Sequence, residues 1–407
     1  MNCIRNISDS IIWVGGNDRR TALFENLFPI PRGVSYNSYV ILDEKTAVLD
    51  TADAAIAELF LENVDAALAD RALDYLIVNH MEPDHCALIA EMLVRYPKLQ
   101  VVSNTKALQM IGQFFELQTI EKRSGSSFAD RTIMVAEGDT LSLGSHTLQF
   151  VMAPMVHWPE VMVTYEQSEK ILFSADAFGT FGAHNGTIFA DELNFDRDWL
   201  QEARRYYTNI VGKYGVQVQA LLKKASSLDI QVICPLHGPI WRENVSYFLG
   251  KYDQWSRYEA EEKGVLIAYG SMYGHTENAA NVLANELAKR GMTNIAMYDV
   301  SRTDVSELIG EAFRYTNIVL ASPTYNGGMY PAMEHFLLDM KALNLQNRTI
   351  TLIENGSWAP MAGKQMRAVL ETMKNITVQE AVLTVKSSLK EEQMEQVRAI
   401  ADSISRE

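Results

Sequence analysis

The sequence predicts an α/β protein with two domains, a β-rich sandwich with helices over residues 1–260 and a doubly wound parallel sheet over residues 261–407. Three observations support this prediction. The first part contains pairs of short runs that alternate apolar and polar residues, which are typical of antiparallel hairpins. The second part alternates short apolar strands with helices, which is typical of a parallel sheet. A chain of 407 residues is also long enough for two hydrophobic cores.

The first domain is predicted from hairpin signals separated by helical stretches. Residues 37–42 and 47–50 alternate around the turn 43–46, and two further pairs follow the same pattern. Those later strands cover residues 140–143, 147–152, 161–165 and 170–174, and amphipathic helices cover residues 54–69 and 86–96. A charged and polar stretch over residues 247–263 has the pattern of a helical connector. It places the domain boundary near Glu261.

The second domain is predicted from regular alternation of strands and helices. Two of its strands, 318–322 and 350–354, are continuous apolar runs of the kind that is buried on both faces. The other strands are expected at 265–269, 295–300 and 379–385, with helices at 276–289, 330–343 and 364–373 and at the C-terminal end. This order favours a doubly wound sheet.

Composition excludes several classes of partner. The net charge of −15 argues against nucleic acid and anionic membranes, and no apolar run approaches the roughly 20 residues of a membrane span. The first residues lack the basic and apolar regions of a signal peptide. The three cysteines, Cys3, Cys86 and Cys234, are scattered and form no C-x-x-C pair. We therefore expect a reducing, cytoplasmic location.

A dense cluster of metal-ligand side chains follows the apolar run 75–78. The cluster contains His80, Glu82, Asp84 and His85 within six residues. A zinc hydrolase of this general pattern would have a second histidine where Glu82 stands. Because a carboxylate is a harder donor than an imidazole, the substitution favours iron or manganese over zinc.

Further candidate ligands also follow predicted strands. His157 comes after the strand 147–152, Asp176 follows the apolar run 171–175, and His237 follows 230–234. Together with the first cluster they make seven donors, whereas one zinc ion needs about four. Seven donors therefore indicate two metals, and Asp176 is the candidate for a bridging carboxylate because it stands apart from the cluster.

Three loops of the second domain predict a cofactor pocket. The first loop joins a strand to a helix with small and hydroxyl residues, which suits a phosphate at a helix N-terminus. It lacks the lysine and spacing of a nucleoside-triphosphate loop and the fingerprint of a dinucleotide site, so a monophosphate fits best. The candidate binding residues are Ser271, Met272, Tyr273, Gly274, His275 and Thr276; Ser322, Pro323, Thr324, Tyr325, Asn326 and Gly327; and Asn355, Gly356, Ser357, Trp358 and Ala359. In open α/β sheets such loops meet at the carboxyl ends of the strands.

The motifs resemble those of flavodiiron proteins, in which a metallo-β-lactamase-like αββα sandwich precedes a flavodoxin-like FMN domain. The matching phrases are His-x-Glu-x-Asp-His from His80, His-Trp-Pro-Glu from His157, Ser-Ala-Asp-Ala-Phe-Gly around Asp176, and Pro-Leu-His-Gly-Pro around His237. The resemblance implies two irons. One would be held by His80, Glu82 and His157 and the other by Asp84, His85 and His237, with Asp176 between them.

The resemblance also implies a function. Two ferrous ions and a reduced FMN hold four electrons, enough to reduce O2 to water, and two of these electrons convert two NO molecules to N2O. Flavodiiron proteins carry out one or both reactions. The resemblance further implies a head-to-tail homodimer and an external electron donor, with rubredoxin as the first candidate.

Two other classes of function remain open at this point. One is a metal-dependent hydrolase of the metallo-β-lactamase-like fold with a regulatory flavodoxin domain, against which Glu82 argues. The other is a non-enzymatic electron-transfer module with a structural metal, which does not account for seven converging donors. Metal analysis combined with an absorption spectrum separates all three.

Overall fold

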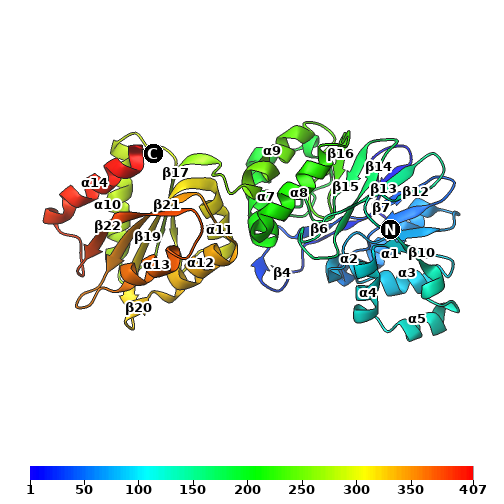
Figure 1. Cartoon of the computed structure of the whole chain (residues 1–407), viewed down its shortest axis with the longest axis horizontal. Helices are drawn as coiled ribbons and strands as arrows, with labels where there is room; N and C mark the ends of the chain where they lie inside the picture. The colour runs from blue at the N-terminus through cyan, green and yellow to red at the C-terminus, as the bar shows by residue number, and fades with distance from the viewer. Residues whose placement is uncertain (407) are drawn as a thin grey trace. The chain divides into compact units, whose positions relative to one another are not determined.

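The computed structural model describes residues 1–406 and divides into two compact units (Figure 1). The first unit contains residues 1–207 and 216–253, and the second contains residues 208–215 and the chain from residue 254 onward. A short segment that lies between the two parts of the first unit in sequence therefore belongs to the second unit. The boundary that the sequence suggests, between residues 260 and 261, stays a prediction.

The first unit is built on two sheets whose inner faces share one core. The larger sheet has the order β1-β2-β7-β8-β9-β10-β11, antiparallel as far as β8 and parallel from β8 to β11. Its strands are β1 (Arg5–Asn6), β2 (Ile11–Trp13), β7 (Tyr39–Ile41), β8 (Ala47–Leu49), β9 (Tyr75–Ile77), β10 (Gln100–Ser103) and β11 (Thr132–Met134). The antiparallel pairing of β7 with β8 confirms the first predicted hairpin.

The second sheet has the order β12-β13-β14-β15-β16. Its strands are β12 (Thr140–Ser142), β13 (Thr147–Met152), β14 (Met162–Glu166), β15 (Ile171–Phe173) and β16 (Val232–Cys234). Buried side chains from both sheets, such as Tyr39, Ile77, Phe150 and Phe173, belong to one hydrophobic cluster. Two small ribbons complete the strands: β3 (Gly16–Asp18) with β6 (Val34–Tyr36), and β4 (Leu23–Phe24) with β5 (Phe28–Pro29).

Helices cover this pair of sheets. They are η1 (Ala54–Ile56), α1 (Ala57–Leu68), α2 (Pro83–Cys86), α3 (Ile89–Arg95), α4 (Thr105–Phe114), α5 (Leu117–Ser124), η2 (Ala129–Arg131), η3 (Ala190–Glu192), α6 (Phe195–Asp198) and α7 (Leu200–Tyr206). A π-helical turn η4 (Tyr207–Val211) and a 3-10 turn η5 (Gly212–Tyr214) follow, then α8 (Gly215–Ala225) and α9 (Val245–Ser256). The single helix predicted over 86–96 is wrong. The helix is interrupted at Leu88, whose N–H donates a hydrogen bond to Thr51 Oγ1 at 3.3 Å.

The second unit contains a parallel sheet with the strand order β18-β17-β19-β21-β22. Its strands are β17 (Glu262–Tyr269), β18 (Ile295–Asp299), β19 (Tyr315–Tyr325), β21 (Arg348–Asn355) and β22 (Ile376–Val385), and β20 (Gly328–Met329) folds back on β19. The order of strands reverses between β17 and β19, which is the position where sheets of this type bind ligands. The helical connector predicted over residues 247–263 is too long at its C-terminal end, because strand β17 begins at Glu262.

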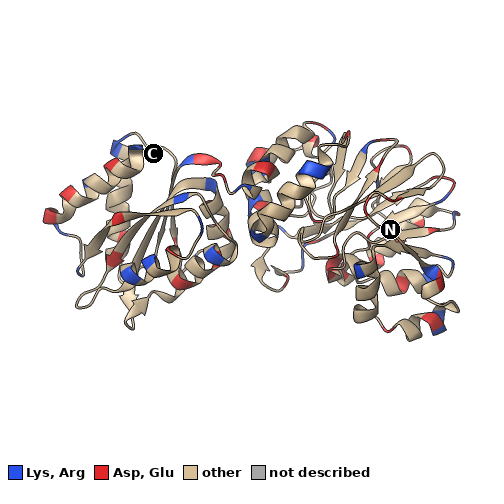
Figure 2. Cartoon of the chain, viewed as in Figure 1, with Lys and Arg blue, Asp and Glu red and all other residues tan. Residues whose placement is uncertain are grey.

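Helices cover both faces of the parallel sheet (Figure 1). One core contains side chains of α11 (Val305–Arg314), α12 (Pro331–Ala342) and α13 (Ala362–Leu370), and the other contains those of α10 (His275–Lys289) and α14 (Met394–Arg406), which follows the turn η6 (Glu391–Gln393). Helix α11 was not predicted; Asp304 begins it by accepting a hydrogen bond from Ser306 N–H. Charged residues lie on these helices, whereas β19 has none (Figure 2). Within residues 1–406, no helix has the length and hydropathy needed to cross a membrane.

Candidate metal centre and cofactor pocket

The loop that carries the first four candidate ligands is held by a buried carboxylate. It leaves β9 after Ile77, and Asp50 accepts hydrogen bonds from Asn79 N–H at 2.7 Å, from Asn79 Nδ2 at 2.8 Å and from His80 N–H at 3.1 Å. Burial raises the pKa of Asp50 to about 6, although these donors counteract it. Pro83 then begins α2, so Asp84 and His85 lie on the first turn of a helix. Asp50 lies outside the ligand motifs that the sequence indicated.

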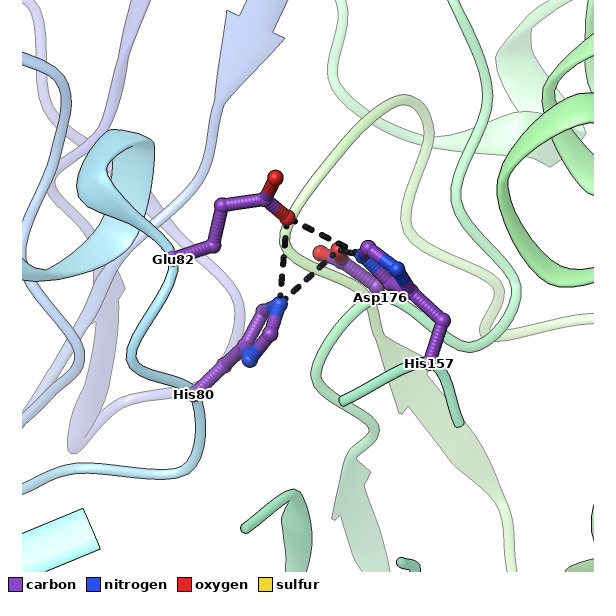
Figure 3. Close-up of side chains that lie close together, drawn as sticks. All are labelled: His80, Glu82, His157 and Asp176. Carbon is purple, nitrogen blue, oxygen red and sulfur yellow. Dashed lines mark hydrogen bonds and ion pairs between the residues drawn. The ribbon is translucent and has the colours of Figure 1, made fainter. Parts of the chain in front are cut away.

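Four of the candidate ligands form a first group. Their side chains point toward one another from three separate segments of the chain (Figure 3). Glu82 Oε2 lies 3.3 Å from His80 Nε2 and 3.0 Å from His157 Nε2. Asp176 Oδ2 lies 3.4 Å from His80 Nε2 and 3.2 Å from His157 Nε2. All four side chains are buried.

The other three candidate ligands form a second group beside the first. Asp84 Oδ2 lies 3.3 Å from His85 Nε2 and 3.2 Å from His237 Nε2, and the two imidazole nitrogens are 3.0 Å apart. Asp176 Oδ1 lies 3.2 Å from His85 Nε2 and 3.6 Å from His237 Nε2. Asp176 therefore presents one oxygen to each group, and the structure brings together all seven residues that the sequence indicated.

The donor set fits two divalent cations. Both oxygens of Asp84 and the Oδ1 of Asp176 are buried without a hydrogen-bond donor among the described residues, and a buried carboxylate oxygen without a partner is costly. Burial alone would raise the pKa of Asp176, but the imidazoles of His85 and His80 hold it well below its ordinary value. Oxygen and imidazole donors in this mixture suit iron or manganese.

Two acceptors outside the groups orient the imidazole rings. His80 Nδ1 lies 2.9 Å from Glu160 Oε1, which also accepts a hydrogen bond from Met81 N–H at 2.9 Å. His237 Nδ1 lies 2.8 Å from the carbonyl oxygen of Ser35. Each contact leaves the opposite nitrogen, Nε2, for a metal. Glu160 belongs to the His-Trp-Pro-Glu motif, and its place three residues after His157 was the signal in the sequence for this role.

A cavity of about 440 Å³ opens onto both groups. It is lined by Glu82 and Asp84, by Pro83, Tyr36 and Asp53, and by Thr21, Leu23, Phe24, Glu25 and Asn26 around the β4–β5 hairpin. Burial and then the charge of Glu82 raise the pKa of Glu25 to about 8. Burial would also raise the pKa of Glu82, but hydrogen bonds from His157 and His80 lower it, so this carboxylate stays ionised. The sequence contained no signal for Glu25 at this position.

Aromatic rings surround His237. Phe24, Tyr36 and Tyr206 have ring centroids 5.3, 5.7 and 5.5 Å from that of His237. Burial raises the pKa of Tyr206 well above its ordinary value, and the charge of Asp176 is the next cause. These rings form an aromatic wall beside His237 in the second group.

The second unit contains a cavity of about 450 Å³ at the carboxyl ends of β17, β19 and β21. All the predicted cofactor-binding residues line it except Gly274 and Ser322, and Met361 and Ser387 line it in addition. Ser322 is buried and instead accepts a hydrogen bond from Tyr330 N–H at 3.2 Å. Gly274, at φ 85°, precedes the first residue of α10 without a capping side chain. The amides at this helix N-terminus therefore suit a phosphate.

Two aromatic side chains of this cavity are unusually exposed. Tyr273 is 88% exposed and Trp358 is 92% exposed. Large apolar groups at such exposure mark a binding surface, and flat rings at the rim suit a flat ring system. At the base, the buried Thr276 Oγ1 accepts a hydrogen bond from Asn355 Nδ2 at 3.3 Å. The pocket thus combines a polar floor with an aromatic rim.

Comparisons with known proteins agree with this geometry. The ODP family beta lactamase matches residues 34–238, and the flavodoxin family matches residues 267–399. The anaerobic nitric oxide reductase flavorubredoxin of Aliivibrio salmonicida is 28% identical over 359 residues, which are 86% of this chain and 69% of that protein. The flavodiiron protein of Giardia intestinalis has a similar structure, with a TM-score of 0.91 and 26% identity, over 100% of this chain and 97% of that one.

A further similar structure is the rubredoxin oxygen:oxidoreductase of Desulfovibrio gigas, with a TM-score of 0.89 and 26% identity, covering 99% of this chain and 98% of that one. The predicted fold and resemblance are therefore confirmed. The cofactors implied are FMN in the flavodoxin domain and a non-haem diiron site at the buried carboxylate and histidine groups. The chain belongs to the flavodiiron proteins.

Proposed function

We propose that this chain is an oxidoreductase that reduces O2 to water, NO to N2O, or both, with electrons that reach a diiron pair through FMN. The observation that supports it most is the position of Asp176, whose two oxygens face two separate ligand groups. A single-metal site has no use for seven donors. A flavodoxin domain in the same chain adds a two-electron cofactor, which a hydrolase does not need.

In this proposal each ligand has a defined place. His80, Glu82 and His157 would hold one iron; Asp84, His85 and His237 would hold the other; and Asp176 would bridge them. When bound, two irons and one FMN supply up to four electrons. Glu82 stands where a zinc hydrolase would have a histidine, and its anionic oxygen donor favours iron over zinc.

The protein prepares this centre in three ways. Glu160 and the Ser35 carbonyl fix the orientation of two imidazoles, so little rearrangement is needed when metal enters. The low pKa of Glu82 keeps it anionic despite burial. The rings of Phe24 and Tyr36, which line the opening, favour a small neutral gas over water at the second group.

The partners belong to the same proposal. We propose a head-to-tail homodimer, a rubredoxin-type electron donor and a cytoplasmic location, on the basis of the family resemblance. Relatives differ in the gas that their names state, since one is a nitric oxide reductase and another an oxygen oxidoreductase. Both gases therefore remain candidate substrates.

The test is to determine metal and flavin content and then to follow consumption of each gas with one reconstituted donor. We expect two irons and one FMN per chain and consumption of at least one gas. Two zinc ions with no gas consumption would contradict the proposal and favour the hydrolase. A difference in kcat/KM between O2 and NO would identify the preferred substrate.

A further inference from the structure

The loop that carries His237 lies outside any helix or strand. Its first and last residues, Pro235 and Pro239, have no N–H to donate. Gly238 has a φ of 76°, and a Cβ atom at this position would lie 1.9 Å from Thr180 Cγ2, so the loop packs closely against its neighbour there. Contacts from other parts of the chain therefore hold His237 in place.

One fully buried residue, Asn37, binds this loop on both sides of His237. Its side-chain Nδ2 donates to the Pro235 carbonyl and to the Gly238 carbonyl, both at 2.9 Å. Its backbone N–H donates to the Leu236 carbonyl at 2.7 Å. Three hydrogen bonds from a single residue therefore fix the carbonyls that flank the ligand.

The orientation of the Asn37 amide is determined by its partners. Its Oδ1 accepts a hydrogen bond from Trp13 Nε1 at 2.9 Å, and His184 Nε2 lies 3.4 Å from the same oxygen. An indole nitrogen can only donate, and a backbone carbonyl can only accept. The NH2 group of Asn37 therefore faces the loop, because the reverse orientation would place donor against donor and acceptor against acceptor.

Support for the first ligand group comes from other residues. Asp50 accepts a hydrogen bond from the backbone N–H of His80, and Glu160 contacts Nδ1 of the same residue. Outer contacts of this kind orient a ligand and so determine the affinity of the site for its metal. A change at Asn37 should therefore disturb the second group and leave the first intact.

We propose that the Asn37 amide positions His237 and thereby sets the metal affinity of the second ligand group, while the first group does not depend on it. A ligand must be held within about 0.5 Å of its working position. Loss of the amide would release two loop carbonyls at once and let the imidazole shift. This role concerns metal binding and not the choice of gas, so its failure would leave the proposed function in place.

The test measures the metal affinity of each group separately. Metal-free Asn37→Asp and the natural protein are titrated with Co²⁺ by visible absorption, and anomalous diffraction at the cobalt edge assigns each step to one group. Aspartate has the shape of asparagine but presents oxygens, which cannot donate, to the two loop carbonyls. The second group should bind Co²⁺ about 10- to 100-fold more weakly, and the first should keep its affinity within about twofold.

Asn63→Asp is the matched control. Asn63 is also fully buried, and its Nδ2 also donates to two backbone carbonyls, those of Val14 at 3.1 Å and Gly15 at 2.8 Å. Neither carbonyl belongs to the loop of His237. This substitution should destabilise the fold to a similar extent but leave the Co²⁺ affinity of both groups unchanged. If it weakens the second group as much as Asn37→Asp does, Asn37 is a structural residue and the proposal is wrong.

Trp13→Phe is a milder variant that decides the question if Asn37→Asp does not fold. It keeps a ring at the buried position but removes the indole donor that fixes the amide. The second group should then bind Co²⁺ about threefold to tenfold more weakly. Natural affinity at the second group, or equal weakening at both groups, would overturn the proposal. If the natural protein binds no Co²⁺ at either group, the proposed function fails together with it.

Discussion

His80 Nδ1 lies 2.9 Å from Glu160 Oε1, and this contact aims Nε2 of the same ring at Glu82 and Asp176. Because a carboxylate partner also raises the basicity of the imidazole, Glu160→Gln should weaken metal binding about 10- to 100-fold. Competition with a chelator measures this. Glu137→Gln is the control, since Glu137 is half exposed and pairs with Lys224 at 2.7 Å. Equal metal affinity in the two variants would show that Glu160 does not orient the ring.

Asp176→Ala should lose both metals. Its carboxylate is the only one of the seven candidate ligands that faces both groups, and its removal leaves four imidazoles with two carboxylates. FMN should remain bound, because its pocket belongs to the other unit. Iron analysis and the flavin absorption spectrum check the two statements. Asp229→Ala, at an exposed pair with Lys170, should keep both cofactors; retention of two irons by Asp176→Ala would refute the bridge.

Thr276→Val should weaken FMN binding about tenfold or more and leave iron in place. The substitution preserves shape but removes a buried hydroxyl at the N-terminus of α10, beside Asn355. Loss of one hydrogen bond to a charged phosphate has about this effect. Flavin fluorescence titration measures the affinity. Thr372→Val, which removes a hydroxyl at an exposed helix end, should bind FMN normally. Normal FMN binding by Thr276→Val would show that Thr276 does not contact the phosphate.

Arg348→Met should lower the free energy of unfolding of the second unit by about 3 kcal/mol. The buried guanidinium donates to the carbonyls of Ala312 and Phe313 at the end of α11 and to that of Tyr258. Burial lowers the pKa of Arg348 to about 10, so the group is still charged at pH 7. Denaturant unfolding of both variants measures the change. Arg302→Met, at an 86% exposed side chain, should change stability by less than about 1 kcal/mol.

His184 should make stability fall in acid. Burial lowers the pKa of His184 to about 3, and the charge of Arg19 is the second cause, whereas an unfolded chain has a value of about 6.5. Above pH 6.5 the ring is neutral in both states and contributes no pH dependence. Between pH 6.5 and 3 only the unfolded chain gains the proton, so stability falls by about 1.4 kcal/mol per pH unit, or about 2 kcal/mol at pH 5.

His184→Gln removes this contribution. Urea unfolding of the metal-free protein at pH 7 and pH 5 should show a smaller acid loss for the variant, by about 2 kcal/mol. His335→Gln is the control, since His335 is exposed on α12, and it should show the acid loss of the natural protein. Parallel pH profiles for His184→Gln and the natural protein would show that the buried ring is protonated in the folded state.

The residues of the candidate sites could be predicted where they follow the ends of predicted strands. The carboxyl ends of β17, β19 and β21 meet at one edge of a parallel sheet, so three separate loops could be assigned to one pocket from sequence alone. Helix α11 was missed, although its apolar face contributes to a core. Residues 208–215 belong to the second unit, although their neighbours in sequence belong to the first. The sequence could not predict this, because packing between distant segments decides it.

By itself, the sequence determined the two-domain α/β architecture and the types of donor at His80, Glu82 and Asp176, because strand periodicity and ligand chemistry are local properties. Only the tertiary structure decided which groups support those donors. Glu160 lies 80 residues from His80 in the chain, and Tyr206 reaches the centre only because Gly179 leaves space for its ring. Such contacts depend on how side chains fill a shared volume, and no spacing along one chain encodes that volume.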